Sequence, residues 1–429
     1  MHILFVRWCA RSRARSHHLT VRQTCFTFLL GSAAALSYAA ETPSFSALLQ
    51  QSQANAPQLL EQAANVRAAS ADARQAAAWL NPSLNIDAEN LNAPLAGGVS
   101  QRQDTYTVTQ MFEIGGKRSA RVEAERRKFD AAGARERQGR LAFASELALA
   151  YATAEAMQQR KELADADLGR ANDDLRAADA LVKAGREAQL RLAQARASAA
   201  AAQASVQLAA ADGTEALERL SSLVGAPEPF SRITHPFLAR FTTSPPRANW
   251  TPLEAPSYAS AAAERDAIAA QLKLEQKRWL PDIGVSVGMR KFAWSDDRAA
   301  TVGLSATIPL FDRNQAGIEA ARERATSAAM RLEAARLSVL GQHRTASAQV
   351  LASERRLQAA ELGQAAGIEA YRLGRLGYEA GKTSLLELLA IRRALSEAKA
   401  LTIEAQLARV RALVNLSLAE GRNVFGETP

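Results

Sequence analysis

The tripeptide Gly381-Lys382-Thr383 is the first candidate for chemistry, because a phosphate-binding loop ends in the same residue types. Such a loop also needs an earlier glycine at a fixed distance and a β-strand before it. Here the preceding glycine, Gly377, is one residue too close, and a helical pattern precedes it. We therefore predict no nucleotide binding.

Metal-binding and catalytic residue types are sparse. His235 and His343 lie far apart in the sequence with no cysteine near either, which does not fit a resident metal site. No nucleophile is spaced with a base and an orienting group, so the sequence predicts neither an enzyme nor a cofactor. The arginines and glutamates interleaved over 121–137 are typical of a solvated helix face.

Residues 1–39 have the pattern of a secretory signal peptide: basic residues without an acid, an apolar run over 26–36, and small residues before the predicted cleavage after Ala39. The apolar run is shorter than the roughly 20 residues of a membrane-spanning helix, which disfavours an anchor. Cleavage removes five arginines and lowers the formal charge from +9 to +4, so we predict no nucleic-acid surface. It also removes both cysteines, Cys9 and Cys25.

The remaining sequence is an internal duplication. Three pairs of matching residues recur at separations of 200, 199 and 196 residues: Trp79 and Trp279, Phe112 and Phe311, Gly185 and Gly381. Two copies are too few for a solenoid, which indicates a pseudo-symmetric pair of building blocks. We predict the first copy over 40–224 and the second over 257–419, followed by a tail over 420–429.

Each copy begins with an alanine- and glutamine-rich helix, over 41–78 and 257–278, which ends before Pro82 or Pro281. Apolar and polar residues then alternate over about 83–112 and 282–311, as in a β-hairpin with one apolar and one polar face. In the second copy the alternation continues as far as Leu310. This pattern fits a soluble sheet and a membrane-spanning sheet equally well.

Long helices follow each hairpin. Residues 117–182 and 315–378 contain no proline, and each stretch would form a rod of roughly 100 Å. The helical pattern resumes after the two matched glycines, to about 224 and 419, so each copy ends in a long helical hairpin. Between the copies, the proline-rich stretch 225–256 is predicted as a linker packed along the rods, with a disordered tether as the alternative.

If the four strands lie in lipid, other chains must complete the sheet. Unpaired backbone groups are costly in hydrocarbon, and four strands are too few to close a barrel. The sequence then implies an oligomeric tube with the long helices attached to it. Four aromatic residues at the strand–helix junctions would form a girdle at one membrane interface: Trp79, Phe112, Trp279 and Phe311.

At these residues the chain resembles the TolC-type outer-membrane efflux protein family, and within it the CzcC-like heavy-metal efflux branch. The resemblance rests on the duplicated plan and on two strings, Phe112-Glu113-Ile114-Gly115-Gly116-Lys117-Arg118 and Ile308-Pro309-Leu310-Phe311-Asp312-Arg313-Asn314-Gln315. It implies a mainly α fold with a membrane β-barrel portion, in which three copies form a twelve-stranded β-barrel on an α-helical barrel.

The resemblance also implies a function. The chain would be the outer-membrane channel, or exit duct, of a tripartite efflux system, and would passively conduct heavy-metal cations to the exterior. The implied location is the outer membrane of a two-membrane bacterium, with an extension into the periplasm. The implied partners are two further copies in a homotrimer, a periplasmic adaptor protein, an inner-membrane pump of the RND type and outer-membrane lipid.

In that family the tips of the helical hairpins form the periplasmic gate and the edge that docks the adaptor. The corresponding residues here are Lys183, Gly185, Arg186 and Glu187 in the first tip, and Tyr378, Gly381, Lys382, Thr383 and Glu387 in the second. Thr383 and Ala390 replace charged gate residues of relatives, so the resemblance does not extend to a ring of salt bridges. From the residues alone, Gly381 and Ser384-Leu385-Leu386-Glu387 indicate helix capping, which is compatible with gating.

Two alternatives stay open at this point. A soluble periplasmic coiled-coil scaffold or adaptor would explain the rods and the export signal, but not the apolar face that the strands share. An outer-membrane factor for drugs or organic compounds would have the same strings, since a passive duct takes its specificity from its pump.

Overall fold

The computed structural model describes residues 41–241 and 250–422. The predicted signal peptide (1–39), part of the predicted linker (242–249) and most of the predicted tail (423–429) lie outside these residues.

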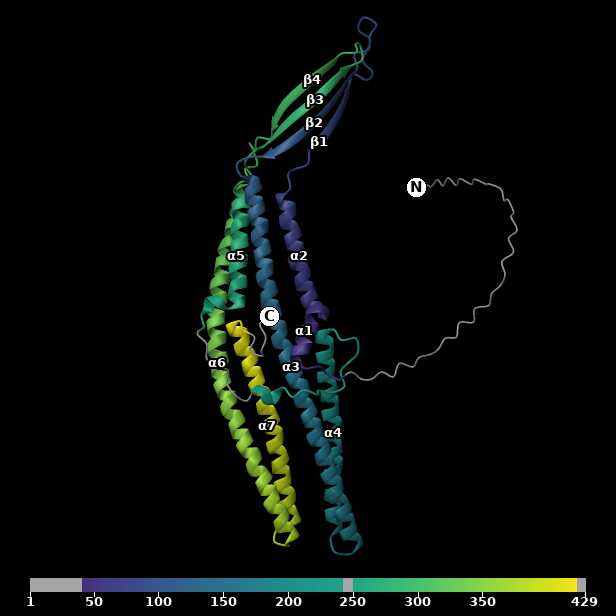
Figure 1. The fold of residues 1–429 in the computed structure, drawn as a ribbon, viewed down its shortest axis with the longest axis vertical. Coiled ribbons are helices and arrows are strands. Elements are labelled where there is room, and N and C mark those ends of the chain that lie inside the picture. The colour runs from purple at the N-terminus through teal and green to yellow at the C-terminus, as the bar shows by residue number, and fades with distance from the viewer. Residues whose placement is uncertain (1–40, 242–249, 423–429) are drawn as a thin grey trace, which may run out of the picture. The chain divides into compact units, whose positions relative to one another are not determined.

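The described chain alternates β-hairpins with long helical hairpins (Figure 1). The elements are α1 (Phe45–Asn55), α2 (Pro57–Ala77), β1 (Ser83–Glu89), β2 (Gln103–Glu113), α3 (Lys117–Lys183), α4 (Gln189–Val224), η1 (Leu238–Phe241), η2 (Pro252–Glu254), α5 (Pro256–Glu275), β3 (Asp282–Phe292), β4 (Arg298–Ala306), α6 (Gln315–Glu379) and α7 (Leu385–Glu420). The order from α2 to α4 repeats from α5 to α7, which confirms the predicted duplication of a β-hairpin followed by a helical hairpin.

The four strands form one antiparallel sheet in the order β1-β2-β3-β4. The central pair, β2 and β3, comes from different halves of the chain and runs in register from Gln103 opposite Phe292 to Glu113 opposite Asp282. Figure 1 shows the sheet at one end of α3 and α6 and both helical-hairpin turns at their other end. The duplication therefore produces a single sheet rather than two separate hairpins.

The predicted single helix over 41–78 is wrong in one respect, because the chain forms two helices there. Ala56, between α1 and α2, has extended dihedral angles (φ −70°, ψ 119°). Pro57 disfavours a helical conformation in the residue before it and is itself well suited to the first position of α2. The residues before α1 are also extended, and Thr42 forms a parallel bridge with Ile233.

The second predicted hairpin is shorter than the sequence pattern indicated. β4 ends at Ala306, although the apolar alternation continues to Leu310. Pro309 has no backbone N–H, so a ladder cannot continue through it, and the chain leaves the sheet before α6 begins.

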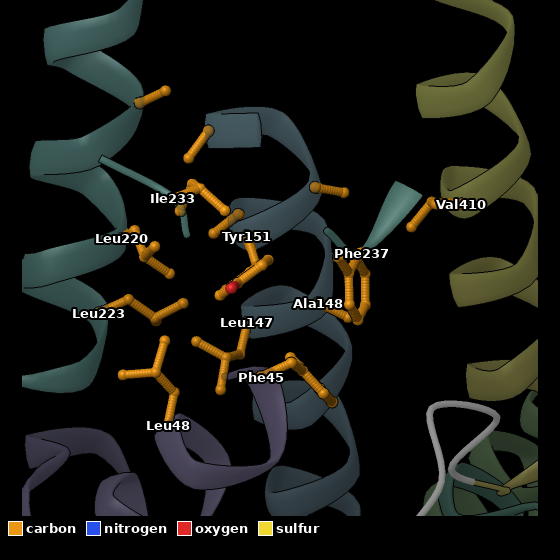
Figure 2. Packing of buried hydrophobic residues seen from close by; sticks show 14 of the residues in the cluster. Phe45, Leu48, Leu147, Ala148, Tyr151, Leu220, Leu223, Ile233, Phe237 and Val410 are labelled. Atoms are coloured by element: carbon orange, nitrogen blue, oxygen red, sulfur yellow. The ribbon is translucent and has the colours of Figure 1, made fainter. Parts of the chain in front are cut away.

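The main hydrophobic core lies where α1, α3, α4, α7 and the linker meet (Figure 2). Tyr151 of α3 is fully buried, and its ring lies 5.3 Å from that of Phe237 in the linker, which in turn lies 5.0 Å from Phe45 of α1. Leu147 and Leu220, also fully buried, join α3 to α4 here. Phe237 thus packs the described part of the linker against α1 and α3.

A buried carboxylate fixes the linker to α3. Glu155 accepts hydrogen bonds from the backbone N–H groups of Phe237 (2.7 Å) and Leu238 (2.9 Å), at the start of η1. Burial raises the pKa of Glu155, and these hydrogen bonds only partly offset that effect. Burial likewise raises the pKa of Tyr151 to about 12, and its hydroxyl donates to the carbonyl oxygen of His235 at 3.1 Å.

The long helices pack chiefly against one another. α3 contacts α2, α4, α5 and α7, whereas α6 contacts α5 and α7. In the part of the chain that the structure describes, no helix has both the length and the apolar character of a membrane span.

Candidate functional site

One face of the sheet is apolar, because the strand register places apolar residues opposite one another. One row across all four strands contains Leu84, Val108, Val287 and Val302, and the next contains Ile86, Tyr106, Met289 and Ala300. The side chains on this face are uncovered: the exposed fraction reaches 79% for Val302 and for Leu304, which lies opposite Val285 in a further row of the same face. An apolar surface of this kind normally marks contact with a membrane or another protein.

The opposite face is polar. Asn85, Thr107, Gly288 and Thr301 form one row, and Asp87, Thr105, Arg290 and Ala299 form the next. Asn85 donates a hydrogen bond to the carboxylate of Asp87 at 2.8 Å, and Nε of Arg290 donates to the hydroxyl of Thr105 at 3.1 Å. The two faces thus suit two different environments, one apolar and one aqueous.

The outer edges of the sheet have no strand partner among the described residues. β1 pairs only with β2, and β4 pairs only with β3. The backbone groups along these edges must find partners in water or in another chain.

The four predicted girdle residues are all exposed at the junctions between the sheet and the helices. The exposed fractions of the side chains are 64% for Trp79, 38% for Phe112, 46% for Trp279 and 100% for Phe311. Trp79 and Phe112 contact each other edge to face at 6.2 Å, and the guanidinium of Arg118 lies 5.0 Å above the Trp79 ring. The structure therefore brings the first pair together, and membrane contact stays a prediction for all four.

The same junction contains a reciprocal clamp between the two halves, which sequence analysis missed. Nζ of Lys117, from the first half, donates to the carbonyl of Leu280 at 3.0 Å and forms an ion pair with Asp282 at 2.7 Å, both in the second half. Nζ of Lys277, from the second half, donates to the carbonyl of Gly115 at 3.2 Å. The sequence around Lys117 carries no signal for this role, because its partners Leu280 and Asp282 lie 163 and 165 positions away.

The two long helices begin in the same way, each after a residue in the left-handed conformation. Gly116 (φ 76°) precedes α3, and Asn314 (φ 56°) precedes α6. The side-chain amide of Asn314 donates to both the backbone carbonyl and the carboxylate of Glu275, each at 3.0 Å. Asparagine tolerates this conformation better than most residues, which explains how it substitutes for glycine in the second half.

The first predicted tip is a tight turn between α3 and α4. Gly185 adopts φ 71°, and the backbone N–H of Arg186 donates to the carbonyl of Leu181 at 2.9 Å, which closes the end of α3. Lys183 pairs with Asp179 at 2.6 Å, and Glu187 lies 3.6 Å from Arg191. The charged groups of this tip are thus engaged locally, and Arg186 is exposed.

The second tip has the same construction. Gly381 adopts φ 71°, and the backbone N–H of Lys382 donates to the carbonyl of Gly377 at 2.8 Å. The hydroxyl of Ser384 accepts from the backbone N–H of Glu387 at 3.2 Å, which confirms the predicted cap of α7. Tyr378, Lys382 and Glu387 are exposed and Thr383 is half-buried, and a gating role for these residues stays a prediction.

Polar contacts between α3 and α7 join the two helical hairpins above the tips. Arg392 forms an ion pair with Asp174, and the hydroxyl of Ser396 bonds to Asp167. Sequence analysis missed these residues, because their partners lie more than 200 positions away and only the fold brings them together.

Each of the two histidines in the described chain takes part in a contact that holds elements of the fold together. His343 stacks on Trp250 at 3.9 Å and lies 3.2 Å from Glu420, whereas the backbone of His235 accepts from Tyr151. Within residues 41–241 and 250–422, no group of three or more His, Cys, Asp or Glu side chains is placed to hold a metal ion.

Comparison with curated proteins gives two relatives that span nearly the whole chain. The nickel and cobalt resistance protein CnrC of Cupriavidus metallidurans is 53% identical over 394 residues, which cover 92% of this chain and 94% of CnrC. The nickel-cobalt-cadmium resistance protein NccC of Alcaligenes xylosoxydans xylosoxydans is 52% identical over 390 residues, which cover 91% and 89%. The cobalt-zinc-cadmium resistance protein CzcC of Cupriavidus metallidurans is more distant, at 29% identity over 70% of this chain and 72% of its own length.

The fold also matches solved structures. A crystal structure of CusC superposes with a TM-score of 0.76 at 19% identity and covers 88% of this chain and 92% of CusC. Residues 48–226 and 253–422, one stretch in each half of the duplication, match the family described as outer membrane efflux protein. The chain therefore belongs to the outer membrane efflux protein family.

Proposed function

We propose that this chain is the outer-membrane exit duct of a tripartite efflux system that exports heavy-metal cations, nickel and cobalt first among them. The observation that carries the proposal is the sheet with one exposed apolar face, one polar face and two unpaired edges. Family membership supports the same conclusion.

The unpaired edges require further copies of the chain. In the hydrocarbon part of a bilayer every backbone N–H and C=O group needs a protein partner, and only a closed barrel supplies one at the edge of a sheet. Four strands are too few for a lumen, so β1 of one protomer would pair with β4 of its neighbour. Three protomers supply twelve strands, with the apolar face toward lipid and the polar face toward a water-filled lumen.

The helices support a ring of copies independently. α4 exposes a stripe with spacings of three and four residues: Leu190, Ala193, Ala197, Ala201, Ala204, Leu208 and Ala211. α6 exposes a stripe of larger residues: Met330, Leu337, Leu351, Leu362, Leu373 and Leu376. Small residues on one helix and large ones on another are suited to knobs-into-holes packing. We infer that α4 of one protomer packs on α6 of the next.

The proposed substrates rest on the two closely similar relatives, whose names state resistance to nickel and cobalt. A passive duct takes its specificity from the pump that feeds it, so the chain would share the pump class of those systems. Export of organic compounds is the second candidate, and no residue of the described chain favours it.

A soluble scaffold is the remaining alternative from the sequence. It would need a partner to cover the apolar face of the sheet and would leave the two edges unpaired. The outer-membrane duct accounts for both features at once.

We further propose that the two helical-hairpin tips form the periplasmic gate and the docking edge for the adaptor protein, with an RND-type pump beneath it. Tyr378 and Glu387 are exposed at the second tip, and the turn glycines hold the backbone of both tips in fixed conformations. A ring of three such pairs of tips would narrow the duct at its periplasmic end.

The proposal is tested by deleting the gene and measuring growth across nickel, cobalt, cadmium and organic toxicants. Complementation with the intact gene should restore growth on the metals, and the protein should fractionate with the outer membrane as a heat-resistant trimer. A protein that stays monomeric and dissolves without detergent would refute the duct. A deletion strain sensitive only to organic compounds would refute the metal assignment.

A further inference from the structure

The apolar face of the sheet ends abruptly near the hairpin loops. The last apolar row contains Ile86, Tyr106, Met289 and Ala300, and the next row toward the loops contains Ala88, Asp104, Lys291 and Arg298. Both rows project from the same face, because successive residues of a strand alternate between faces and these rows are two residues apart. On this face of β2, β3 and β4, the side chains therefore change from apolar to charged between one row and the next.

Two of these charges are alike and directly opposed. Lys291 of β3 is the register partner of Arg298 of β4, and both side chains are exposed. Like charges opposite each other in an antiparallel pair are destabilising. A sheet that places two cations in this position gains stability when an anion lies between them.

The carboxylate nearest in register is already engaged. Asp104 faces Lys291 across β2 and β3, but it pairs with Arg102 at 3.0 Å. In the described parts of the chain, no carboxylate oxygen lies within the 4.0 Å ion-pair distance of Lys291 or Arg298. Arg102, Asp104, Lys291 and Arg298 together carry a net charge of +2, and the two acids of the adjoining turn, Asp296 and Asp297, form no ion pair with either cation.

The charged row lies directly beyond the apolar rows, on the side of the hairpin loops. In a bilayer the headgroup region lies directly beyond the hydrocarbon. In the proposed barrel the charged row is therefore at the level expected for lipid headgroups. Trp294, between β3 and β4, packs on Phe292 with ring centroids 4.5 Å apart, on the opposite, polar face of the sheet.

We propose that Lys291 and Arg298 bind the phosphate of a lipid in the outer leaflet, whose acyl chains lie on the apolar rows below. The proposal rests on the proposed function, which places the loop end of the sheet at the outer surface because α3 and α6 leave the sheet at its other end. Arginine and lysine are both suited to lipid phosphate, the first as a planar fork and the second as a point charge.

The test measures lipid retained on the full-length trimer in detergent by native mass spectrometry. The probes are lipid A and the same lipid without its phosphates. The variant combines Lys291→Gln with Arg298→Gln, and the matched control is Arg290→Gln, one residue away on the polar face. We expect about 30-fold weaker retention of lipid A in the double variant, equivalent to about 1 kcal/mol for each cation, and no change in the control.

A variant with Lys291→Arg should retain lipid A, because it keeps the charge. Equal retention of the two lipids by the unaltered protein, or equal loss in Arg290→Gln and the double variant, would overturn the proposal. Displacement of lipid A by an equal concentration of inorganic phosphate would overturn the assignment to a lipid. The same spectra report the oligomer, so a trimer without bound lipid contradicts only this site, whereas a chain that never assembles contradicts the proposed function.

Discussion

Replacing Leu304 with arginine tests whether the exposed face of the sheet lies in lipid. Leu304 is 79% exposed in the single chain and lies in the row of Val285, between the two ends of the apolar band. On a protein surface in water, such a change would alter the free energy of unfolding by at most about 0.5 kcal/mol. On the lipid face of a membrane barrel, it costs about 2–4 kcal/mol per copy.

In a trimer the cost applies three times and reaches about 6–12 kcal/mol, which is enough to abolish assembly. The assay is the amount of heat-resistant oligomer in the outer-membrane fraction. The control is Ser305→Arg, on the adjacent residue of β4 and on the opposite, polar face, where we expect assembly to persist. Leu304→Asp should have a smaller effect than arginine, because acids are tolerated better on such faces. Equal depletion by the arginine substitutions at 304 and 305 would refute the assignment of the two faces.

Substitutions at three further positions test the interior and the turns, two of them with a control at another position. Glu155→Gln should flatten the pH dependence of the melting temperature, measured by circular dichroism in detergent. Burial raises the pKa of Glu155, so the folded state holds this proton more tightly than the unfolded state. In the unaltered protein, stability therefore falls as pH rises above 4.5, the ordinary pKa of a glutamate. Glu155→Ala should instead cost about 1–3 kcal/mol for each of the two buried hydrogen bonds that it removes, and an unchanged melting temperature would argue against this anchor. Lys117→Met should lower the free energy of unfolding by about 1–3 kcal/mol, because it leaves Asp282 and the carbonyl of Leu280 unpaired. The control Lys128→Met breaks an exposed pair with Glu125 and should lower it by less than about 0.5 kcal/mol. Similar costs for the two variants would contradict the clamp. Gly381→Ala should destabilise the chain by about 1–2 kcal/mol, because this residue has a positive φ that alanine adopts only with strain. The control Gly363→Ala, inside α6 with open space around it, should stabilise the chain by up to about 1 kcal/mol. A gain in stability at both positions would refute the backbone strain at Gly381.

Sequence analysis predicted the parts of the fold that depend on local periodicity. Alternation indicated the hairpins, and the absence of proline over 117–182 indicated a helix that the structure extends to Lys183. It was wrong where proline acts on its neighbours, at Ala56 before Pro57 and in the residues after Ala306. The apolar–polar periodicity of the sequence continues through such positions, whereas a regular helix or strand ends there.

The contacts that hold the two halves together were beyond prediction from one sequence. Lys117 and Asp282 are 165 residues apart, and nothing in the neighbourhood of either residue specifies the other. The same holds for Glu155, which in sequence is one more glutamate on a long helix and in the structure is a buried acceptor for the linker. The positions of the tips could be predicted because a glycine marks each turn, whereas the proposed gating role depends on neighbours that a single chain does not contain.

The reciprocal clamp and the shared sheet together explain why the duplication acts as one unit. A two-stranded hairpin alone is marginally stable, and the pairing of β2 with β3 gives each half the strands it lacks. Lys117 and Lys277 then fix the start of α3 and the end of α5 to each other, each held by the opposite half. In the proposed ring of three chains, the symmetry that closes the barrel also arranges the helices. It would bring α4 of each chain toward α6 of the next, where the stripes of small and large side chains lie.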